Sequence, residues 1–579
     1  MELLIRNGTL VDGSGAPPRP ADIAVENGLV TRIAPAKSLA AEAATKTLEA
    51  EGLLVTPGFV DVHTHYDGQA TWDPVLAPSS WHGVTSVVMG NCGVGFAPVR
   101  PEGHRELIEL MEGVEDIPGS ALSDGIRWAW ESFPEYLDAL ESMGRCIEVA
   151  AQIPHGAVRA YVLGPDRAAH NAPASAAQVD RMAGIVREGI EAGGVAFSSN
   201  RLPLHTSIHG DPVPGTFADE QELLALLHAV RAGGGSRVEV VPAGAMGEDR
   251  DAPLREVALY RQLSLETGCT ITFSLAQINT DPKHWVDVLA ASAQANAEGA
   301  RLVPQVSGRP AGLLLSWDTF NPFMERPTYQ ALLALASDER LARLREPATR
   351  ATILGEASHD GMAMKMMKNS LDATFALDTG PAFEPDPEDS MAQRIARSGQ
   401  EPDELLYDTM CELAEAAGEG KPGFLHVFFS GYKNGSLEDI GEMMLHRDTV
   451  VGLADGGAHC SMICDASMPT FLLQHWVRDR TRGPRLPVET AVRMLSRDPA
   501  ELYGFGDRGV LEAGRRADLN LIDLDALTLH VPEITHDLPT GAPRVVQRVD
   551  GFRATVVRGQ ITFRDGMETG AHPGGLIRA

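Results

Sequence analysis

The chain has 579 residues, enough to bury a large core and to form more than one domain. Hydrophobic residues make up 44% of it and charged residues 22%, the composition of a globular protein rather than a disordered one. Its 79 acidic residues against 49 basic ones give a formal net charge of −30, which argues against nucleic acid or an anionic membrane as a partner, because both require a basic surface. A small-molecule substrate is the expected partner, and an anionic one stays open because it needs only one or two local arginines.

The N-terminal residues show neither the apolar core nor the cleavage site of a signal peptide, and no apolar run is long enough to span a bilayer. The six cysteines are scattered, which fits reduced thiols better than a disulfide framework. We therefore expect a cytoplasmic protein. The sequence leaves open whether the chain forms a homo-oligomer.

Both ends of the chain have short β-strand patterns. Leu3–Gly13 is expected to form strand, turn and strand, and Ile23–Ile33 a hairpin through Asn27-Gly28. A further hairpin is expected over Ala554–Gly566, and the Gly/Pro-rich residues up to Arg578 are expected to end as a surface tail.

Neither end has enough apolar surface to fold alone. We therefore expect residues 1–55 and 508–579 to form one small, discontinuous β-sandwich domain.

Between residues 56 and 507, strand-like runs alternate with helical ones, such as 219–232, 254–267 and 283–298. The strand candidates are the run that leads to His63 and residues 86–89, 147–153, 195–198, 238–241, 270–274, 302–306, 424–429 and 450–454. Alternating strands and helices predict a parallel sheet, and a count near eight favours a closed (β/α)8 TIM-like barrel. Of the nine candidates, we expect Phe424–Phe429 to lie outside the ring.

The stretch from about 316 to 423 breaks this alternation and is rich in proline, methionine and acidic residues. We interpret it as a cap inserted into the barrel, where it would shape a substrate pocket, because barrel enzymes carry their sites on loops that follow the strands.

Candidate metal ligands follow four predicted strands. His63 and His65 end the first strand, Cys92 the second, His155 the third and Asp455 the last. Strand ends of a barrel converge on one mouth, and these residue types are good ligands for a zinc-like ion. The His-x-His motif by itself fits a metal site or two polar residues satisfied by carbonyls and water at a strand exit.

Pro57–His65 resembles the opening signature of the amidohydrolase superfamily, and Gly90–Gly93 resembles its N-acyl-D-amino acid deacylase (D-aminoacylase) branch. Asp498–Leu519 and His536–Pro543 are similar to the return of that branch to its small β domain. The resemblance covers the whole chain.

This resemblance implies a metal-dependent hydrolase. His63, His65 and Asp455 would hold the first metal position, and Cys92 would belong to the second position or bridge the two. Asp455 would also be the general base and acid, taking a proton from water and passing it to the leaving amine.

Two further family histidines, at the ends of the fifth and sixth strands, are missing. Val238–Gly244 contains no histidine, Leu275 stands in the second histidine's place, and Gln277 replaces a lysine that would hold the substrate carboxylate. We therefore expect one tightly bound Zn²⁺ and leave a second ion open.

Nearby loops could supply substitutes for these residues. His205, His209 and Arg201 follow the fourth strand and could reach the mouth, and a bidentate arginine suits a carboxylate. His459 is expected to touch substrate.

His155, within a pattern similar to the family's Gly-His-x-x-Arg, is equally well interpreted as a buried structural residue. Glu239 is expected to point into the barrel wall in a supporting role.

The sequence thus predicts a metal-dependent hydrolase that cleaves a C–N amide bond in a small molecule, with an N-acyl amino acid as the expected substrate. A hydrolase of cyclic amides or carbamoyl groups is the enzymatic alternative. The missing histidines keep open a metal-poor homologue that binds a ligand without turnover.

Overall fold

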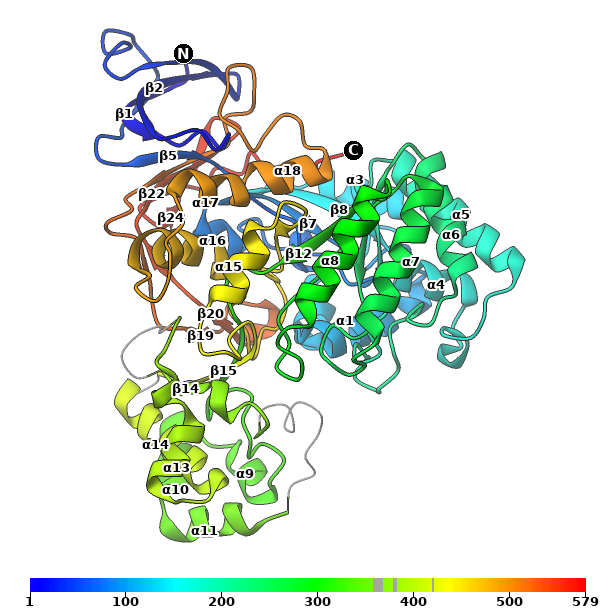
Figure 1. The fold of residues 1–579 in the computed structure, drawn as a ribbon, viewed down its shortest axis with the longest axis vertical. Coiled ribbons are helices and arrows are strands. Elements are labelled where there is room, and N and C mark those ends of the chain that lie inside the picture. Colours follow the sequence, from blue (N-terminus) through cyan, green and yellow to red (C-terminus); the bar gives the residue numbers. More distant parts are fainter. Residues whose placement is uncertain (358–367, 378–382, 419–420) are drawn as a thin grey trace.

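The computed structural model describes residues 1–357, 368–377, 383–418 and 421–579. Figure 1 shows a central barrel, with the sheet that contains β1, β2 and β5 at one end and a separate lobe that contains α9, α10, α11, α13 and α14 at the other. Within the described residues, no helix combines the length and apolar character needed to cross a membrane.

Eight parallel strands form the barrel sheet and pair in chain order. They are β6 (Phe59–Asp61), β7 (Val84–Met89), β8 (Glu148–Pro154), β9 (Ala196–Asn200), β10 (Arg237–Val241), β11 (Thr270–Ser274), β12 (Leu302–Val306) and β16 (Val450–Val451). The sheet closes just beyond its first and last strands, where His65 N donates to Gly456 O (2.8 Å) and Asp455 N donates to His63 O (3.1 Å). The predicted (β/α)8 barrel is confirmed.

Helices connect these strands. They are α1 (His104–Glu115), α2 (Gly119–Gly125), α3 (Phe133–Glu141), α4 (His155–Leu163), α5 (Ala176–Glu191), α6 (Glu220–Ala232), α7 (Ala252–Thr267), α8 (His284–Ala297), α15 (Glu438–Leu445), α16 (Met468–Phe471), α17 (Val488–Leu495) and α18 (Arg497–Tyr503). The three helices predicted from periodicity are confirmed as α6, α7 and α8, to within two residues at each end. Local chemistry sets these limits, because the Asp219 side chain accepts from Glu222 N before α6 and Gly268 ends α7 in a left-handed turn.

Both termini contribute to a nine-stranded sheet. Its members are β1 (Leu3–Leu10), β2 (Arg19–Glu26), β3 (Leu29–Pro35), β4 (Lys46–Glu49), β5 (Leu54–Pro57), β17 (Leu519–Ile522), β22 (Phe552–Val557), β23 (Gln560–Arg564) and β24 (Met567–Glu568). The chain from the N-terminus meets the chain from the C-terminus where β5 pairs with β17. Short strands near the end of the chain form two further ribbons, β18 (Thr528–Leu529) with β21 (Val549–Asp550) and β19 (Glu533–Thr535) with β20 (Arg544–Val546).

The two predicted hairpins are confirmed as β2–β3 and β22–β23, the first with Asn27 and Gly28 at positive φ. The strand–turn–strand prediction for Leu3–Gly13 is wrong. Strand β1 runs through Asn7-Gly8, and the residues on both sides of this pair face β2. Gly8 pairs with Ala21, and Arg6 and Asn7 form a bulge opposite Asp22, whose carboxylate accepts from Asn7 N.

The lobe between β12 and β16 has its own sheet and hydrophobic core. Its elements are β13 (Ala311–Leu315), β14 (Thr374–Ala376), β15 (Leu425–Ser430), α9 (Pro327–Leu332), α10 (Ser337–Leu344), α11 (Pro347–Gly355), α13 (Met391–Ser398) and α14 (Pro402–Ala417). Strand β15 pairs with β13 and β14, so the prediction that Phe424–Phe429 lies outside the barrel is confirmed. The strands that frame the lobe extend a few residues beyond the 316–423 interval in which we expected the cap.

The end of the chain is docked, which corrects the expectation of a surface tail. Arg145 and Gly574 exchange two backbone hydrogen bonds, and Ile577 N donates to Val149 O (2.7 Å). The Arg578 guanidinium pairs with Asp138 and Glu141 on α3.

A buried ion pair joins the barrel to the terminal sheet. Arg508 and Glu148 are only 4% and 3% exposed, and Arg508 also donates to Ser86 Oγ (2.9 Å). Glu148 also pairs with Arg516, so Arg508→Met removes one of its two cationic partners and is expected to lower the free energy of unfolding by about 2 kcal/mol. The control Arg187→Ala, which breaks the exposed pair with Glu191, is expected to cost less than about 1 kcal/mol. Chemical denaturation measures both, and equal small losses would contradict the prediction.

Candidate metal centre

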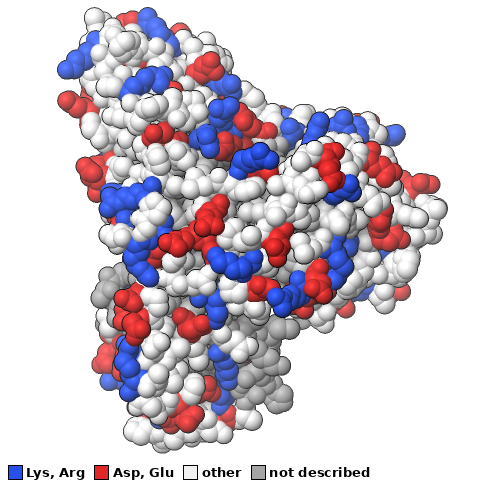
Figure 2. All heavy atoms as spheres, in the orientation of Figure 1, with Lys and Arg blue, Asp and Glu red and all other residues white. Residues whose placement is uncertain are grey.

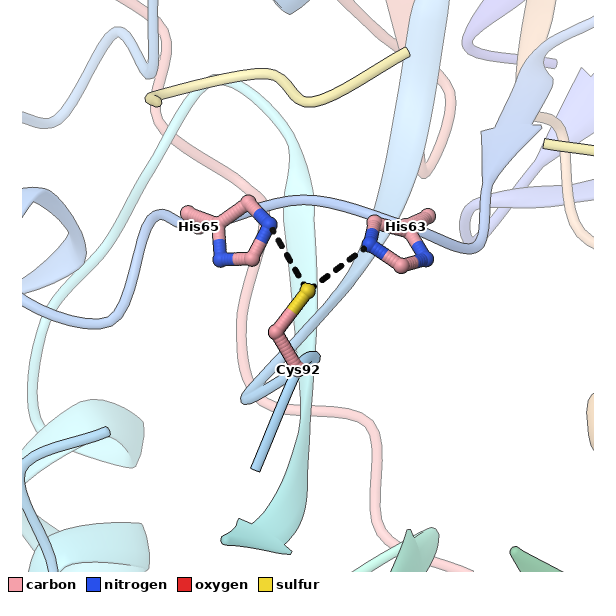
Figure 3. Close-up of side chains that lie close together, drawn as sticks. All are labelled: His63, His65 and Cys92. Carbon is pink, nitrogen blue, oxygen red and sulfur yellow. Dashed lines mark hydrogen bonds between the residues drawn. The ribbon is translucent and has the colours of Figure 1, made fainter. Parts of the chain in front are cut away.

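Two histidines, a cysteine and a carboxylate meet at the C-terminal mouth of the barrel. The thiol Sγ of Cys92 lies 3.4 Å from His63 Nε2 and 3.9 Å from His65 Nε2, as Figure 3 shows. Asp455 Oδ1 lies 3.5 Å and 3.7 Å from the same two nitrogens. In a tetrahedral zinc site, ligand atoms lie about 3.3–3.6 Å apart, so these spacings are close to those that an ion requires.

The backbone at this centre is held in an unusual conformation. Cys92 and Asp455 have φ values of 57° and 49°, in the left-handed region that residues with a Cβ rarely adopt. A Cβ on Gly456 would lie 2.4 Å from Ser79 Oγ, so only glycine fits between Asp455 and the next turn. Strained conformations of this kind gather at functional sites.

The second nitrogen of each histidine ring faces a buried acceptor. His63 Nδ1 lies 3.0 Å from the Gln305 side-chain oxygen, and His65 Nδ1 lies 3.3 Å from Glu115 Oε1. A proton on Nδ1 leaves the Nε2 lone pair free for a metal. Burial lowers the pKa of both rings, which favours this neutral form.

Two buried carboxylates add negative charge around the centre. Glu115 and Glu239 are 2% and 0% exposed, and Oε1 of each has no hydrogen-bond partner. Glu239 Oε2 accepts from Cys92 N (3.1 Å). In the described parts of the chain, only histidines form ion pairs with these two residues.

Burying unpaired anions is costly, and here it raises the pKa of Glu239 to about 8 and that of Glu115 well above its usual value. Burial and the same carboxylates also raise the pKa of the Cys92 thiol. A bound cation would compensate all three groups. The centre therefore fits a zinc-like ion by its donor set and by its unbalanced charge.

Asp455 differs from these carboxylates. Burial alone would raise its pKa, but the neighbouring rings of His65, His63 and His459 hold the pKa well below the usual value. Its side chain is 27% exposed, more than any other ligand candidate at this centre. Asp455 is thus an ionised carboxylate with access to the mouth.

Two of the histidines expected to contact substrate lie near the centre. The ring of His459 is 24% exposed, with Nε2 3.8 Å from Glu115 Oε2. Burial and the nearby His459 and His65 lower the pKa of His205 to about 3, and its Nδ1 has no hydrogen-bond partner. Both residues can therefore face a ligand at the mouth.

Three other candidates are engaged elsewhere. His155 is fully buried, with Nδ1 2.9 Å from Ser199 Oγ and Nε2 3.0 Å from Glu222 Oε1, so neither ring nitrogen is open to a substrate. The Arg201 guanidinium donates to Glu256 (2.6 Å) on α7 and to a backbone carbonyl. His209 lies on an exposed loop against Glu109 (3.1 Å).

The ends of the fifth and sixth strands supply no ligand in place of the missing histidines. Leu275 is buried, and both ends of the Gln277 amide are occupied, by Asp439 and by the backbone N of Lys433. Sequence reasoning missed Glu115 and Gln305. Glu115 is the last residue of α1, and nothing in the helical pattern marks a side chain that reaches the mouth.

The chain is similar to known proteins over most of its length. The model of a family described as "Amidohydrolase family" matches residues 46–563. An uncharacterized protein of Mycobacterium tuberculosis is 26% identical over 599 residues, covering 98% of this chain and 92% of the relative. D-aminoacylase of Alcaligenes xylosoxydans xylosoxydans is 24% identical over 578 residues, covering 100% and 97%.

Solved structures share the fold over the full length of both chains. A D-aminoacylase structure superposes with a TM-score of 0.65 at 20% identity. The N-acyl-D-glutamate deacylase of Bordetella bronchiseptica, solved with zinc and a phosphonate inhibitor, gives 0.64 at 22% identity. Since the family model matches most of its length, this chain belongs to the amidohydrolase family and, with its D-aminoacylase relatives, is a metal-dependent hydrolase of carbon–nitrogen bonds other than peptide bonds.

Proposed function

We propose that the protein is a zinc-dependent deacylase that cleaves the amide bond of a small N-acylated amino acid. The convergence of His63, His65, Cys92 and Asp455 at the barrel mouth carries this proposal. The names of the D-aminoacylase and N-acyl-D-glutamate deacylase relatives support the substrate class. The six free, buried cysteines support a cytoplasmic location.

In this proposal His63, His65, Cys92 and Asp455 hold the ion. When bound, zinc supplies a Lewis acid that activates water and polarises the scissile carbonyl. The Asp455 carboxylate takes the proton from the attacking water and returns it to the nitrogen of the leaving amine. Its low pKa ensures that it begins the cycle ionised. His459 and His205 line the mouth and contact the substrate.

One observation favours a second candidate, a hydrolase of cyclic amides or carbamoyl groups. Arg201 is held by Glu256 and Gln277 by Asp439, so neither is free to bind the carboxylate of an amino acid. A substrate without a free carboxylate would not need them.

The face in Figure 2 shows acidic and basic side chains interspersed, without a basic surface that would indicate a large anionic partner.

A hydrolysis screen separates the two candidates. Zinc-loaded protein is assayed with N-acyl D- and L-amino acids, small cyclic amides and N-carbamoyl amino acids, and released amine or ring opening is measured. Turnover of the N-acyl amino acids alone supports the first proposal, and turnover of the cyclic or carbamoyl compounds alone supports the second. A protein that binds these compounds without turning over any of them would contradict both.

The first prediction concerns metal content. We expect the centre to hold about one zinc ion, because one set of strand-end ligands is present. Elemental analysis of protein never exposed to chelator should give about one ion more per chain for the wild type than for the His63→Ala/His65→Ala variant. Equal metal content in the two proteins would contradict the site.

The second prediction concerns Asp455→Asn. If Asp455 moves the proton, the variant should lose about two to four orders of magnitude in kcat while remaining folded. A carboxylate that only caps the turn would cost about 1 kcal/mol of stability and leave turnover nearly intact. Asp408→Asn, which alters an ion pair with Arg350 in the lobe, is the control and should keep wild-type activity. A folded Asp455→Asn protein with near-normal hydrolysis would refute the mechanism.

The third prediction concerns Glu115, which faces His65 Nδ1. Glu115→Gln keeps the shape of the side chain but removes its charge, so it should weaken zinc binding about 10- to 100-fold in a chelator competition. Glu112→Gln, on the same helix but hydrogen-bonded to Gly119 N, is the matched control. Unchanged affinity in the Glu115 variant would show that this carboxylate does not support the metal.

A further inference from the structure

A second group of metal-binding side chains lies where the end of the chain meets the barrel. It consists of Cys146, Glu568 and His572, whose ligand atoms all lie within 4.8 Å of one another. His572 Nε2 is 2.6 Å from Glu568 Oε1, and the Cys146 thiol points at Ala571 O (3.8 Å). None of these residues belongs to the centre at the mouth.

The three side chains come from two parts of the fold that are far apart in the sequence. Cys146 lies just before β8, whereas Glu568 ends β24 of the terminal sheet and His572 follows it. The backbone holds them together, because Arg145 exchanges two hydrogen bonds with Gly574. The group is therefore preorganised by strand pairing on both sides, and its geometry does not rest on flexible side chains alone.

The donor set suits a zinc-like ion. Thiolate, imidazole and carboxylate are the three ligand types that zinc takes from proteins, and a water molecule can complete a tetrahedron. The side chains of Glu568 and His572 are 35% and 32% exposed, which provides an entry path and room for that water. Cys146 is fully buried, so the metal would be reached from the side of the other two ligands.

The charge around Cys146 also favours a cation. The carboxylates of Glu568 and Asp73 lie close enough to act electrostatically on the buried Cys146 thiol. Thiols release their proton when they bind zinc, and the positive ion offsets the same negative charges.

We propose that Cys146, Glu568 and His572 form a structural metal site that fastens the end of the chain to the barrel. The site lies before the N-terminal end of β8, whereas the ligands of the catalytic centre follow the C-terminal ends of their strands. In barrel enzymes the face at the N-terminal ends contributes to stability instead of catalysis. The bound ion joins residues more than 400 positions apart, and it holds the final residues against α3 and β8.

Cobalt titration tests this site, because a thiolate ligand gives Co²⁺ an intense charge-transfer absorption. The protein used is full-length, metal-free Cys92→Ser, in which the catalytic centre has no thiol. We expect one equivalent of Co²⁺ per chain to produce the thiolate absorption. Introducing Cys146→Ser as a second substitution should abolish this absorption. Introducing His572→Ala instead should weaken Co²⁺ binding.

Two controls isolate the site. Cys269→Ser removes another buried thiol. His530→Ala breaks an exposed histidine–carboxylate pair with Asp550, which belongs to neither candidate metal group of the described residues. Both, introduced into the Cys92→Ser protein, should leave the cobalt absorption unchanged. No thiolate absorption in Cys92→Ser, or the same absorption after Cys146→Ser, would overturn the proposal and leave a buried thiol beside a surface ion pair.

Hydrogen exchange gives a second readout in the wild-type protein. Amides in residues 567–579 should exchange more slowly with zinc than after chelation. This difference should vanish in His572→Ala, which changes a side chain that is 32% exposed and leaves the core intact. An equal difference in His572→Ala would count against the site. Since His572→Ala leaves the catalytic ligands intact, its hydrolysis rate should match the wild type, so this test is independent of the proposed deacylase activity.

Discussion

Two backbone hydrogen bonds between the first and last strands determine where the chemistry of this protein lies. His65 N donates to Gly456 O and Asp455 N donates to His63 O, so the chain after β6 lies directly beside the chain after β16. Residues almost 400 positions apart thereby share one strand-end register. Cys92 enters from β7, the neighbour of β6. Without this closure, the Nε2 atoms of the two histidines would not face the Asp455 carboxylate.

The closed barrel also buries two carboxylates beside the proposed metal site. Glu115 and Glu239 lie deep behind the rings of His65 and His63, and the described residues offer them no arginine or lysine partner. Leaving such groups charged without compensation costs several kcal/mol each, and neutralising them requires protons at the same place. A divalent ion removes both costs at once, which means that stability and metal binding should be coupled at this centre. The ion-pair network around Arg508 shows the other solution, in which the chain supplies its own cations.

Sequence alone predicted the barrel, the hairpins and the four converging residues, because strand ends are marked by short apolar runs followed by polar residues. It did not predict the partners that occupy His155, Arg201 and His209. Those partners are glutamates on α6, α7 and α1, 55 to 100 positions away, and no local pattern links them to a particular histidine or arginine. Glu115 was missed for the same reason, since its approach depends on the left-handed turn at Asp116 that ends α1.

Because the fifth and sixth strands lack the family histidines, the candidate metal ligands all come from neighbouring strands on one side of the barrel. The first, second and last strands supply the donor atoms, while β10 and β12 contribute Glu239 and Gln305 behind His63. In the proposed site, one side of the barrel would thus hold the ion, and the other orients His63 and supplies negative charge. A non-catalytic homologue would not need an ionised Asp455 that is open to the mouth. The exposed Asp455 carboxylate beside the rings of His63 and His65 favours hydrolysis over simple ligand binding, because it provides the proton acceptor that water attack requires.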